Sequence, residues 1–249
     1  MAASSTAGEE LVDASSKPGE HHGGIMLPWR TLLLGTVALS AFLCLGAAPE
    51  AWVFDRAAIS RGELWRLITG HWVHSDLAHA IWDITALLLL GALFEARLQW
   101  RLPLALLIGS VGVDAWLWWG DPALRYYCGL SGILNSLLIV GLMQLWRDLR
   151  HPLILLTGVG AAVKIIVEIN AGQALLTQTA WPSVPTVHAA GFLCGLVLGW
   201  GIWISGNSLC NRQDNSQKGF SGRNRRLPLC ERWNNLTGGT VEIKTRGLP

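Results

Sequence analysis

Residues 188–199 read His-Ala-Ala-Gly-Phe-Leu-Cys-Gly-Leu-Val-Leu-Gly, an apolar stretch in which Gly191, Gly195 and Gly199 recur every four residues. Residues four apart lie on one face of a helix, so the three glycines form a smooth stripe against which a second helix can pack closely. Such a stripe is typical of helices that pack inside a membrane. It predicts a helical bundle, with His188 at the start of the helix that carries the stripe.

The overall composition agrees with a membrane-embedded core. Hydrophobic residues make up 51% of the 249 residues, charged residues only 14%, and the mean hydropathy is +0.37. Soluble domains carry about 25% charged residues, and here the shortfall is concentrated in the middle of the chain because both ends are polar. The formal net charge of +2 is too small to indicate a nucleic-acid partner. We therefore expect a protein that lies in a lipid bilayer.

Six apolar stretches each have about the 20 residues that a helix needs to cross the hydrocarbon core. They predict an all-α membrane protein with a six-span core over residues 29–205. Polar segments at 1–28 and 206–249 flank this core, and we expect both to be disordered tails. The expected spans are residues 29–48, 75–96, 102–119, 129–147, 152–170 and 185–205.

Lysine and arginine predict the orientation, because they accumulate on the cytoplasmic side of a membrane. If the amino terminus is inside, the inner segments carry fourteen of these residues and the outer segments carry four. Both termini are therefore expected in the cytoplasm. The second, fourth and sixth spans then run from the outside inward, and their amino-terminal ends share one depth.

Three polar residues from distant parts of the sequence fall in this layer: His79, Ser131 and His188. Polar groups inside a membrane are costly and usually face a bundle interior or a wet cavity. A serine and a histidine at matched depth can act as nucleophile and general base. The helix amino termini also direct free N–H groups at this layer, where an oxyanion would need stabilising.

The segment Gly129-Leu130-Ser131-Gly132 puts the serine between glycines at a loop-to-helix junction, where the backbone can approach a substrate closely. This motif alone is weak, since glycine and serine are common in membrane spans. If the helix that packs on the glycine stripe is the fourth span, His188 is brought to Ser131. The alternative interpretation is that the stripe only serves packing and that His188 is an interfacial histidine.

Together these motifs resemble the rhomboid family of intramembrane serine proteases. Rhomboids combine a GxSG serine on the fourth span with a histidine on the sixth, and they carry a histidine pair and a downstream amide entering the second span. The resemblance implies a Ser131–His188 dyad rather than a triad, with oxyanion stabilisation by His79 and by the first N–H groups of the fourth span. The supporting residues that it implies around the dyad are His74, His79, Asp83, Gly129 and Gly132.

Within this family, the six-span core and the stretch WRLITGHWVH at 65–74 are most similar to the rhombosortase branch. So is the pattern Lys164-x-x-x-Glu168, an i,i+4 pair that we interpret as mutual neutralisation of buried charge. The branch implies a bacterial inner-membrane enzyme that cuts a membrane-anchored protein near the outer leaflet. Its substrates would carry a carboxy-terminal Gly-Gly motif, a single span and a basic cluster.

Asp83 departs from the family pattern, which has asparagine at this position. An amide can donate a hydrogen bond to an oxyanion, whereas an ionised carboxylate only accepts. Either burial keeps Asp83 protonated so that it donates, or Asp83 holds His79 while His79 and the backbone N–H of Ser131 stabilise the oxyanion. A third possibility is that the chain is catalytically impaired and binds client transmembrane helices.

The remaining polar residues carry weaker hypotheses. His71 is interpreted as a solvated interfacial histidine, Asn135 as a packing residue, and Asp114 as an acid that pairs with Arg125 or faces a wet cleft. With Lys164 and Glu168, Asp114 also leaves open a small transporter, although no inverted repeat is evident. The five cysteines have no metal-ligand spacing and predict neither a disulfide framework nor a metal site, and we expect no cofactor.

Overall fold

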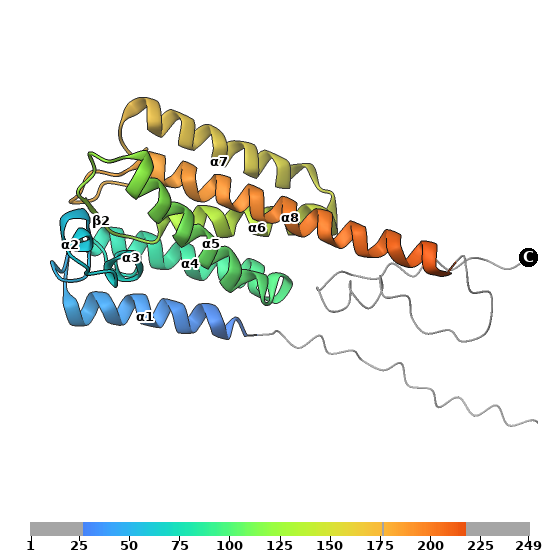
Figure 1. Cartoon of the computed structure of the whole chain (residues 1–249), viewed down its shortest axis with the longest axis horizontal. Coiled ribbons are helices and arrows are strands. Elements are labelled where there is room, and N and C mark those ends of the chain that lie inside the picture. Colours follow the sequence, from blue (N-terminus) through green and yellow to red (C-terminus); the bar gives the residue numbers. More distant parts are fainter. Residues whose placement is uncertain (1–26, 176, 218–249) are drawn as a thin grey trace, which may run out of the picture.

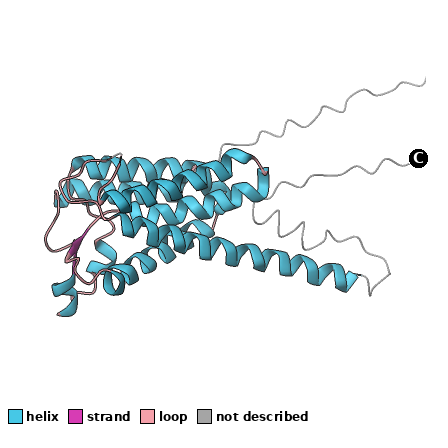
Figure 2. Ribbon diagram, turned by 90° about the horizontal axis from the view of Figure 1, so that it is seen from above, coloured by secondary structure: helices cyan, strands magenta, loops and turns pink. Residues whose placement is uncertain are grey.

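The computed structural model describes residues 27–175 and 177–217, and within them the chain forms a bundle of helices that lie side by side (Figure 1). The short helices and a two-stranded ladder lie together at one end of this bundle (Figure 2). The elements in chain order are α1 (Trp29–Leu45), β1 (Phe54–Asp55), α2 (Arg56–Ser60), α3 (Arg66–Thr69), α4 (Leu77–Leu98), α5 (Arg101–Ala115), the π-helical turn η1 (Trp116–Gly120), β2 (Tyr126–Tyr127), α6 (Ser131–Leu149), α7 (Pro152–Ala171) and α8 (Pro185–Gln217).

The predicted apolar stretches coincide within a few residues with α1, α4, α5 plus η1, α6 and α7. The last helix differs, because α8 continues to Gln217 beyond the predicted boundary at residue 205. A helix satisfies its own backbone hydrogen bonds and, once nucleated, extends readily into polar sequence. The rest of the two predicted tails, residues 1–26 and 218–249, lies outside the described residues.

Four helical segments in the described part of the chain are long and apolar enough to cross a membrane, which supports a multi-pass membrane protein. α1 is apolar as well but shorter. A total of six spans and a cytoplasmic location of both termini stay predictions. The four segments are Leu77–Leu98, Arg101–Gly120, Pro152–Ala171 and Pro185–Ser205.

α6 is the central helix of the bundle and packs against α4, α5, α7 and α8. Leu137 and Ile133 on this helix are buried in the main apolar core, where they join Leu87 of α4 and Ala105 of α5. The hydroxyl of Ser136 donates to the Ala105 carbonyl at 3.0 Å, so this buried hydroxyl is satisfied. A helix enclosed on several sides is held at a defined depth, together with any side chain at its amino terminus.

The glycine stripe of α8 faces α6, as its spacing predicted. A Cβ atom on Gly191 would overlap the carbonyl oxygen of Gly132, and one on Gly195 would lie 2.7 Å from the carbonyl oxygen of Ser136. Backbone therefore touches backbone along this contact, which only glycine permits. The close approach brings the amino-terminal ends of α6 and α8 together.

α1 is attached to α4 through a buried carboxylate. Glu95 of α4 accepts hydrogen bonds from the backbone N–H groups of Arg30 at 3.0 Å and Thr31 at 2.8 Å, and from the Thr31 hydroxyl at 2.6 Å. These N–H groups belong to the first turn of α1, which has no cap from Pro28. A side chain from a neighbouring helix thus satisfies donors that would otherwise be left unpaired in an apolar environment.

The short ladder orients the loop that leads into α6. β1 and β2 pair antiparallel, with Phe54 opposite Tyr127. Just beyond β2, the N–H of Gly129 donates to the carbonyl of Gly70 at 3.0 Å. The segment before α6 is therefore tied to the segment before α4, which holds the two helix starts near each other.

Overpacking a protein core costs roughly 1–3 kcal/mol. We expect Gly191→Ala to lower the free energy of unfolding by at least this amount, because the new methyl group meets backbone that cannot rotate away. Gly201→Ala in the same helix is the matched control, since a Cβ atom there meets nothing within 4 Å. It should change stability by no more than about 0.5 kcal/mol. Unfolding of both variants in mixed micelles, followed by circular dichroism, checks this. Equal stability of the two variants would contradict the close approach of α6 and α8.

Candidate active site

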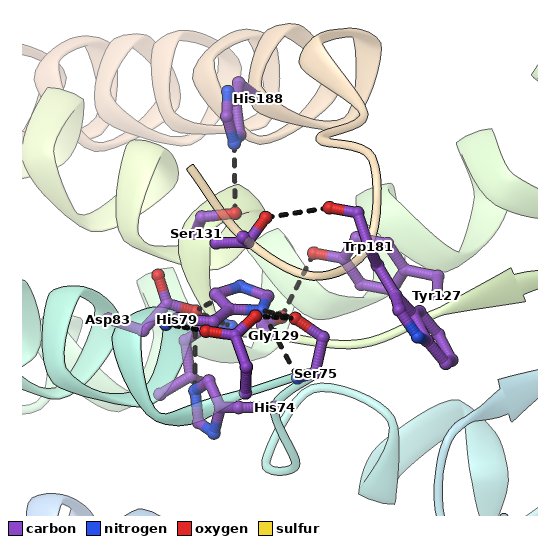
Figure 3. Close-up of polar contacts among 12 residues, drawn as sticks. His74, Ser75, His79, Asp83, Tyr127, Gly129, Ser131, Trp181 and His188 are labelled. Carbon is purple, nitrogen blue, oxygen red and sulfur yellow. Dashed lines mark hydrogen bonds and ion pairs between the residues drawn. The ribbon is translucent and has the colours of Figure 1, made fainter. Parts of the chain in front are cut away.

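Ser131 and His188 meet at the end of the bundle that carries the short ladder. Ser131 is the first residue of α6 and His188 lies in the first turn of α8. The Nε2 atom of His188 lies 3.0 Å from the Ser131 hydroxyl oxygen (Figure 3). The side chain of His188 is only 11% exposed, so this contact is shielded from solvent. A hydroxyl and an imidazole at this distance can exchange a proton.

A carboxylate also contacts His188. The Oε2 atom of Glu168, on α7, lies 3.3 Å from the Nδ1 atom of His188, and the Glu168 side chain is fully buried. The sequence spacing did not place an acidic residue beside His188, and the structure brings Glu168 to it. Glu168 was noted in the sequence only as the ion-pair partner of Lys164. A contact with His188 could not be predicted, because the sequence does not show how α7 packs against α8. The ion pair itself forms, at 2.6 Å.

The loop before Ser131 requires glycine. Gly129 has φ +113°, a conformation that side chains with a Cβ atom rarely adopt, and a Cβ atom there would lie 2.5 Å from Nε2 of His79. Its carbonyl accepts a hydrogen bond from the Tyr127 hydroxyl at 3.0 Å. Gly132 is crowded as well, because a Cβ atom would lie 2.9 Å from a methyl group of Val113. Both glycines of the predicted motif thus serve close packing around the serine.

Asp83 acts as an acceptor beneath this loop. Its Oδ2 atom accepts the N–H of Leu130 at 2.6 Å and lies 3.4 Å from Nε2 of both His74 and His79. These contacts support the hypothesis in which Asp83 holds His79 and the loop, rather than the one in which it donates to an oxyanion. His74 is completely buried against the edge of the His79 ring, with centroids 5.2 Å apart. His74 therefore packs beneath the start of α4, next to His79.

The start of α4 is also tied to the loop that precedes α8. Asp76 caps α4 by accepting the N–H of His79 at 2.9 Å, and its second oxygen accepts the N–H of Ala180 at 2.6 Å. Ser75 donates its hydroxyl to Asp76 at 2.8 Å, and the same hydroxyl lies 3.0 Å from Nδ1 of His79. Asp76 and Ser75 were not predicted as part of the site, although an aspartate three residues before a histidine in the first turn of a helix is an N-cap signal.

Two groups near the serine keep their protons at neutral pH. Burial raises the pKa of the Cys128 thiol to about 12, and burial followed by the charge of Asp83 raises the pKa of the Tyr127 phenol. For Asp76, burial acts to raise the pKa, but the hydrogen bonds from Ala180, His79 and Ser75 outweigh it and the pKa lies below its usual value. Asp76 is thus ionised at neutral pH, and its contribution to stability is lost only as the pH falls through this lowered pKa.

A cavity of about 420 Å³ lies over these residues. Ser131, His188, His79 and Asp83 line it, and α4, α6 and α7 add an apolar wall. The 177–184 segment, tied to Asp76, forms its other side. The N-cap residue of α6 is Leu130, whose side chain makes no cap hydrogen bond. Backbone N–H groups in the first turn of a helix have no partner within the helix, so those of α6 can stabilise an oxyanion that forms beside Ser131.

Other predicted polar residues lie elsewhere or have different partners. Nε2 of His71 lies 3.1 Å from Oδ1 of Asp114, and His71 is 1% exposed, so the interpretation of His71 as a solvated residue is wrong. Asp114, for which a pair with Arg125 or a wet cleft was considered, contacts His71. The amide of Asn135 donates to the carbonyl of Ser131 at 2.8 Å and lines the cavity. In the described residues, no group of three histidine, cysteine or acidic side chains is arranged to hold a metal ion.

Comparison with known families bears on this arrangement. The sequence model of a family described as Rhomboid domain matches residues 61–205, which is more than half of the chain. The match includes α4 to α7 and the amino-terminal part of α8, and therefore every residue of the candidate site. No curated protein matches the chain.

We expect Asp83→Leu to lower the free energy of unfolding by about 1–3 kcal/mol, because the buried N–H of Leu130 loses its acceptor. Asp83→Asn is the matched variant. All three contacts of Asp83 use one oxygen, which an amide oxygen can replace. The asparagine variant should therefore lose less than half as much stability in the same micelle titration. Equal destabilisation by both substitutions would show that the negative charge, rather than the acceptor oxygen, holds the loop.

Proposed function

The chain belongs to the rhomboid family, whose members act on membrane-anchored substrates within the bilayer, and we propose that it is an intramembrane serine endopeptidase. The observation that carries the proposal is the 3.0 Å contact between the Ser131 hydroxyl and Nε2 of His188. We further propose that the enzyme has six membrane-spanning helices with both termini in the cytoplasm. The site would then lie just below the outer face of the membrane.

In the proposed reaction, the Ser131 oxygen attacks the carbonyl carbon of the scissile peptide bond and His188 takes the hydroxyl proton. The negative charge that forms on the carbonyl oxygen is stabilised by the first N–H groups of α6 and by His79. His188 then gives its proton to the leaving amine. A water molecule, activated by His188 in the same way, hydrolyses the acyl-enzyme and restores Ser131.

The substrate that fits this proposal is a single-span or tail-anchored protein with a carboxy-terminal Gly-Gly motif before its span, as in the rhombosortase branch. A regular helix resists proteolysis because its carbonyl groups are hydrogen-bonded within the helix. Glycine lowers the cost of unwinding the chain into an extended form that can enter the cavity. The apolar wall of α4, α6 and α7 suits an adjoining membrane span, and the proposed location is the bacterial inner membrane.

Two other functions have less support. A transporter needs polar groups that are free to bind an ion, but Lys164 pairs with Glu168 and Asp114 contacts His71. A protein that only binds client helices would be compatible with Asp83 in place of asparagine. However, such a protein would not require the contact between the His188 imidazole and the Ser131 hydroxyl at the amino-terminal end of α6. The two experiments that follow separate these functions from proteolysis.

A fluorophosphonate probe should label the wild-type protein in membranes, because the probe reacts with a serine activated by a base. A general base contributes roughly 100-fold or more to the rate of such a reaction. Ser131→Ala and His188→Ala should therefore each reduce labelling by at least about 100-fold. Ser183→Ala is the matched control, since this serine lines the same cavity, and it should label like the wild type. Labelling that survives in Ser131→Ala would contradict the proposal.

The substrate proposal predicts cleavage of a reporter that ends in Gly-Gly, an apolar span and a basic cluster. Replacing Gly-Gly by Leu-Leu should lower kcat/KM by at least tenfold, because leucine favours the helix over the extended form by up to about 1 kcal/mol per residue. Reconstituted protein and the Ser131→Ala variant, analysed by mass spectrometry of the products, provide the measurement. Equal cleavage of the two reporters would remove the Gly-Gly preference and leave the protease function intact.

A further inference from the structure

We propose that Glu168 is the positioning residue for His188, so that the site works as a Ser131–His188–Glu168 triad. This inference rests on the proposed function, because it assigns to Glu168 a part in activating the same serine. The three residues come from α6, α8 and α7 and form one line of contacts, at 3.0 Å from Ser131 to His188 and 3.3 Å from His188 to Glu168.

The two oxygen atoms of Glu168 have separate partners. Oε1 accepts from Nζ of Lys164 at 2.6 Å and from the N–H of Leu175 at 3.0 Å. Oε2 faces Nδ1 of His188. The ion pair with Lys164 accounts for the position of Oε1 but does not account for the contact of Oε2 with a histidine on another helix. The first oxygen keeps the carboxylate ionised and fixed, and the second is left for His188.

This contact selects the tautomer of His188. A carboxylate only accepts hydrogen bonds, so the ring hydrogen of neutral His188 must be on Nδ1 where it faces Glu168. Nε2 then presents its lone pair to the Ser131 hydroxyl, which is the form needed to take the proton. The opposite tautomer would set two lone pairs against each other at Glu168 and direct an N–H at the nucleophile.

The charge of Glu168 also matters after proton transfer. When Ser131 attacks, His188 becomes a cation, and a buried carboxylate beside it stabilises that cation because the surroundings screen the attraction poorly. In the resting enzyme the same carboxylate is balanced by Lys164, whose side chain is 39% exposed and can remain hydrated. Lys164 thereby offsets the charge of Glu168 before His188 takes up the proton.

The decisive variant is Glu168→Gln, which keeps the size of the side chain. With the amide oxygen held by Lys164 and Leu175, its NH₂ group faces Nδ1 of His188 and forces the ring hydrogen onto Nε2. We expect kcat on the membrane-anchored reporter to fall at least 100-fold with KM changed less than threefold. In serine proteases with a known triad, the corresponding amide substitution costs about 10⁴ in kcat. Glu168→Asp retains the charge and should recover at least tenfold over Glu168→Gln.

The matched control is Glu95→Gln, the same substitution at a buried carboxylate that joins α4 to α1. It should leave kcat per folded molecule within threefold of the wild type. Nitrogen-15 NMR of the histidine rings, with His188→Ala to assign the signal, gives a readout that a merely structural role would not change. We expect hydrogen on Nδ1 of His188 in the wild type and on Nε2 in Glu168→Gln.

The inference is overturned if Glu168→Gln keeps kcat within threefold while Ser131→Ala and His188→Ala are inactive; the protease function would then stand with a dyad. It is also overturned if Glu168→Gln and Glu95→Gln lose equal activity, or if Glu168→Asp gives no recovery and the tautomer is unchanged, since these results describe a structural role. Activity that survives in Ser131→Ala would instead remove the proposed function itself.

Discussion

The close approach of α6 and α8 is the constraint on which the rest of the structure depends. Gly191 lies directly against the carbonyl of Gly132, at the level where each helix has its polar residue. A side chain at this contact would separate the helices, and the 3.0 Å contact between Ser131 and His188 would be lost. Tight apolar packing therefore does more here than stabilise a bundle, because it sets the distance between two reactive groups to a fraction of an ångström.

A second constraint is that polar groups in an apolar environment need partners. Glu95 satisfies the first N–H groups of α1, Asp83 accepts the N–H of Leu130, and Glu168 lies between Lys164 and His188. Each carboxylate joins its own helix to a different segment of the chain. The candidate site follows the same rule as the rest of the bundle, and it differs in that the paired hydroxyl of Ser131 and imidazole of His188 line a cavity.

Much of the arrangement was predictable from local signals. The glycine spacing in α8, the glycines around Ser131 and the matched depth of three helix starts predicted that Ser131, His188 and His79 gather at one end of the bundle. The contact of Glu168 with His188 was not predictable, because an i,i+4 pair with Lys164 accounts for both residues locally. The His71–Asp114 contact was missed for a related reason: hydropathy locates a polar residue in a span but does not indicate the direction of its side chain.

Composition and the 3.6-residue period of the helix are enough to locate the apolar helices, the helix faces that can come close and the residue types that could react. The partner of each polar side chain, by contrast, depends on how the helices pack. The rotation of α7 brings Glu168 to His188, the ladder of β1 and β2 orients the loop with Gly129, and Asp76 binds the segment before α8. The physical reason is that a side-chain contact depends on the rotation and depth of two helices together, and neither quantity is encoded in one stretch of residues.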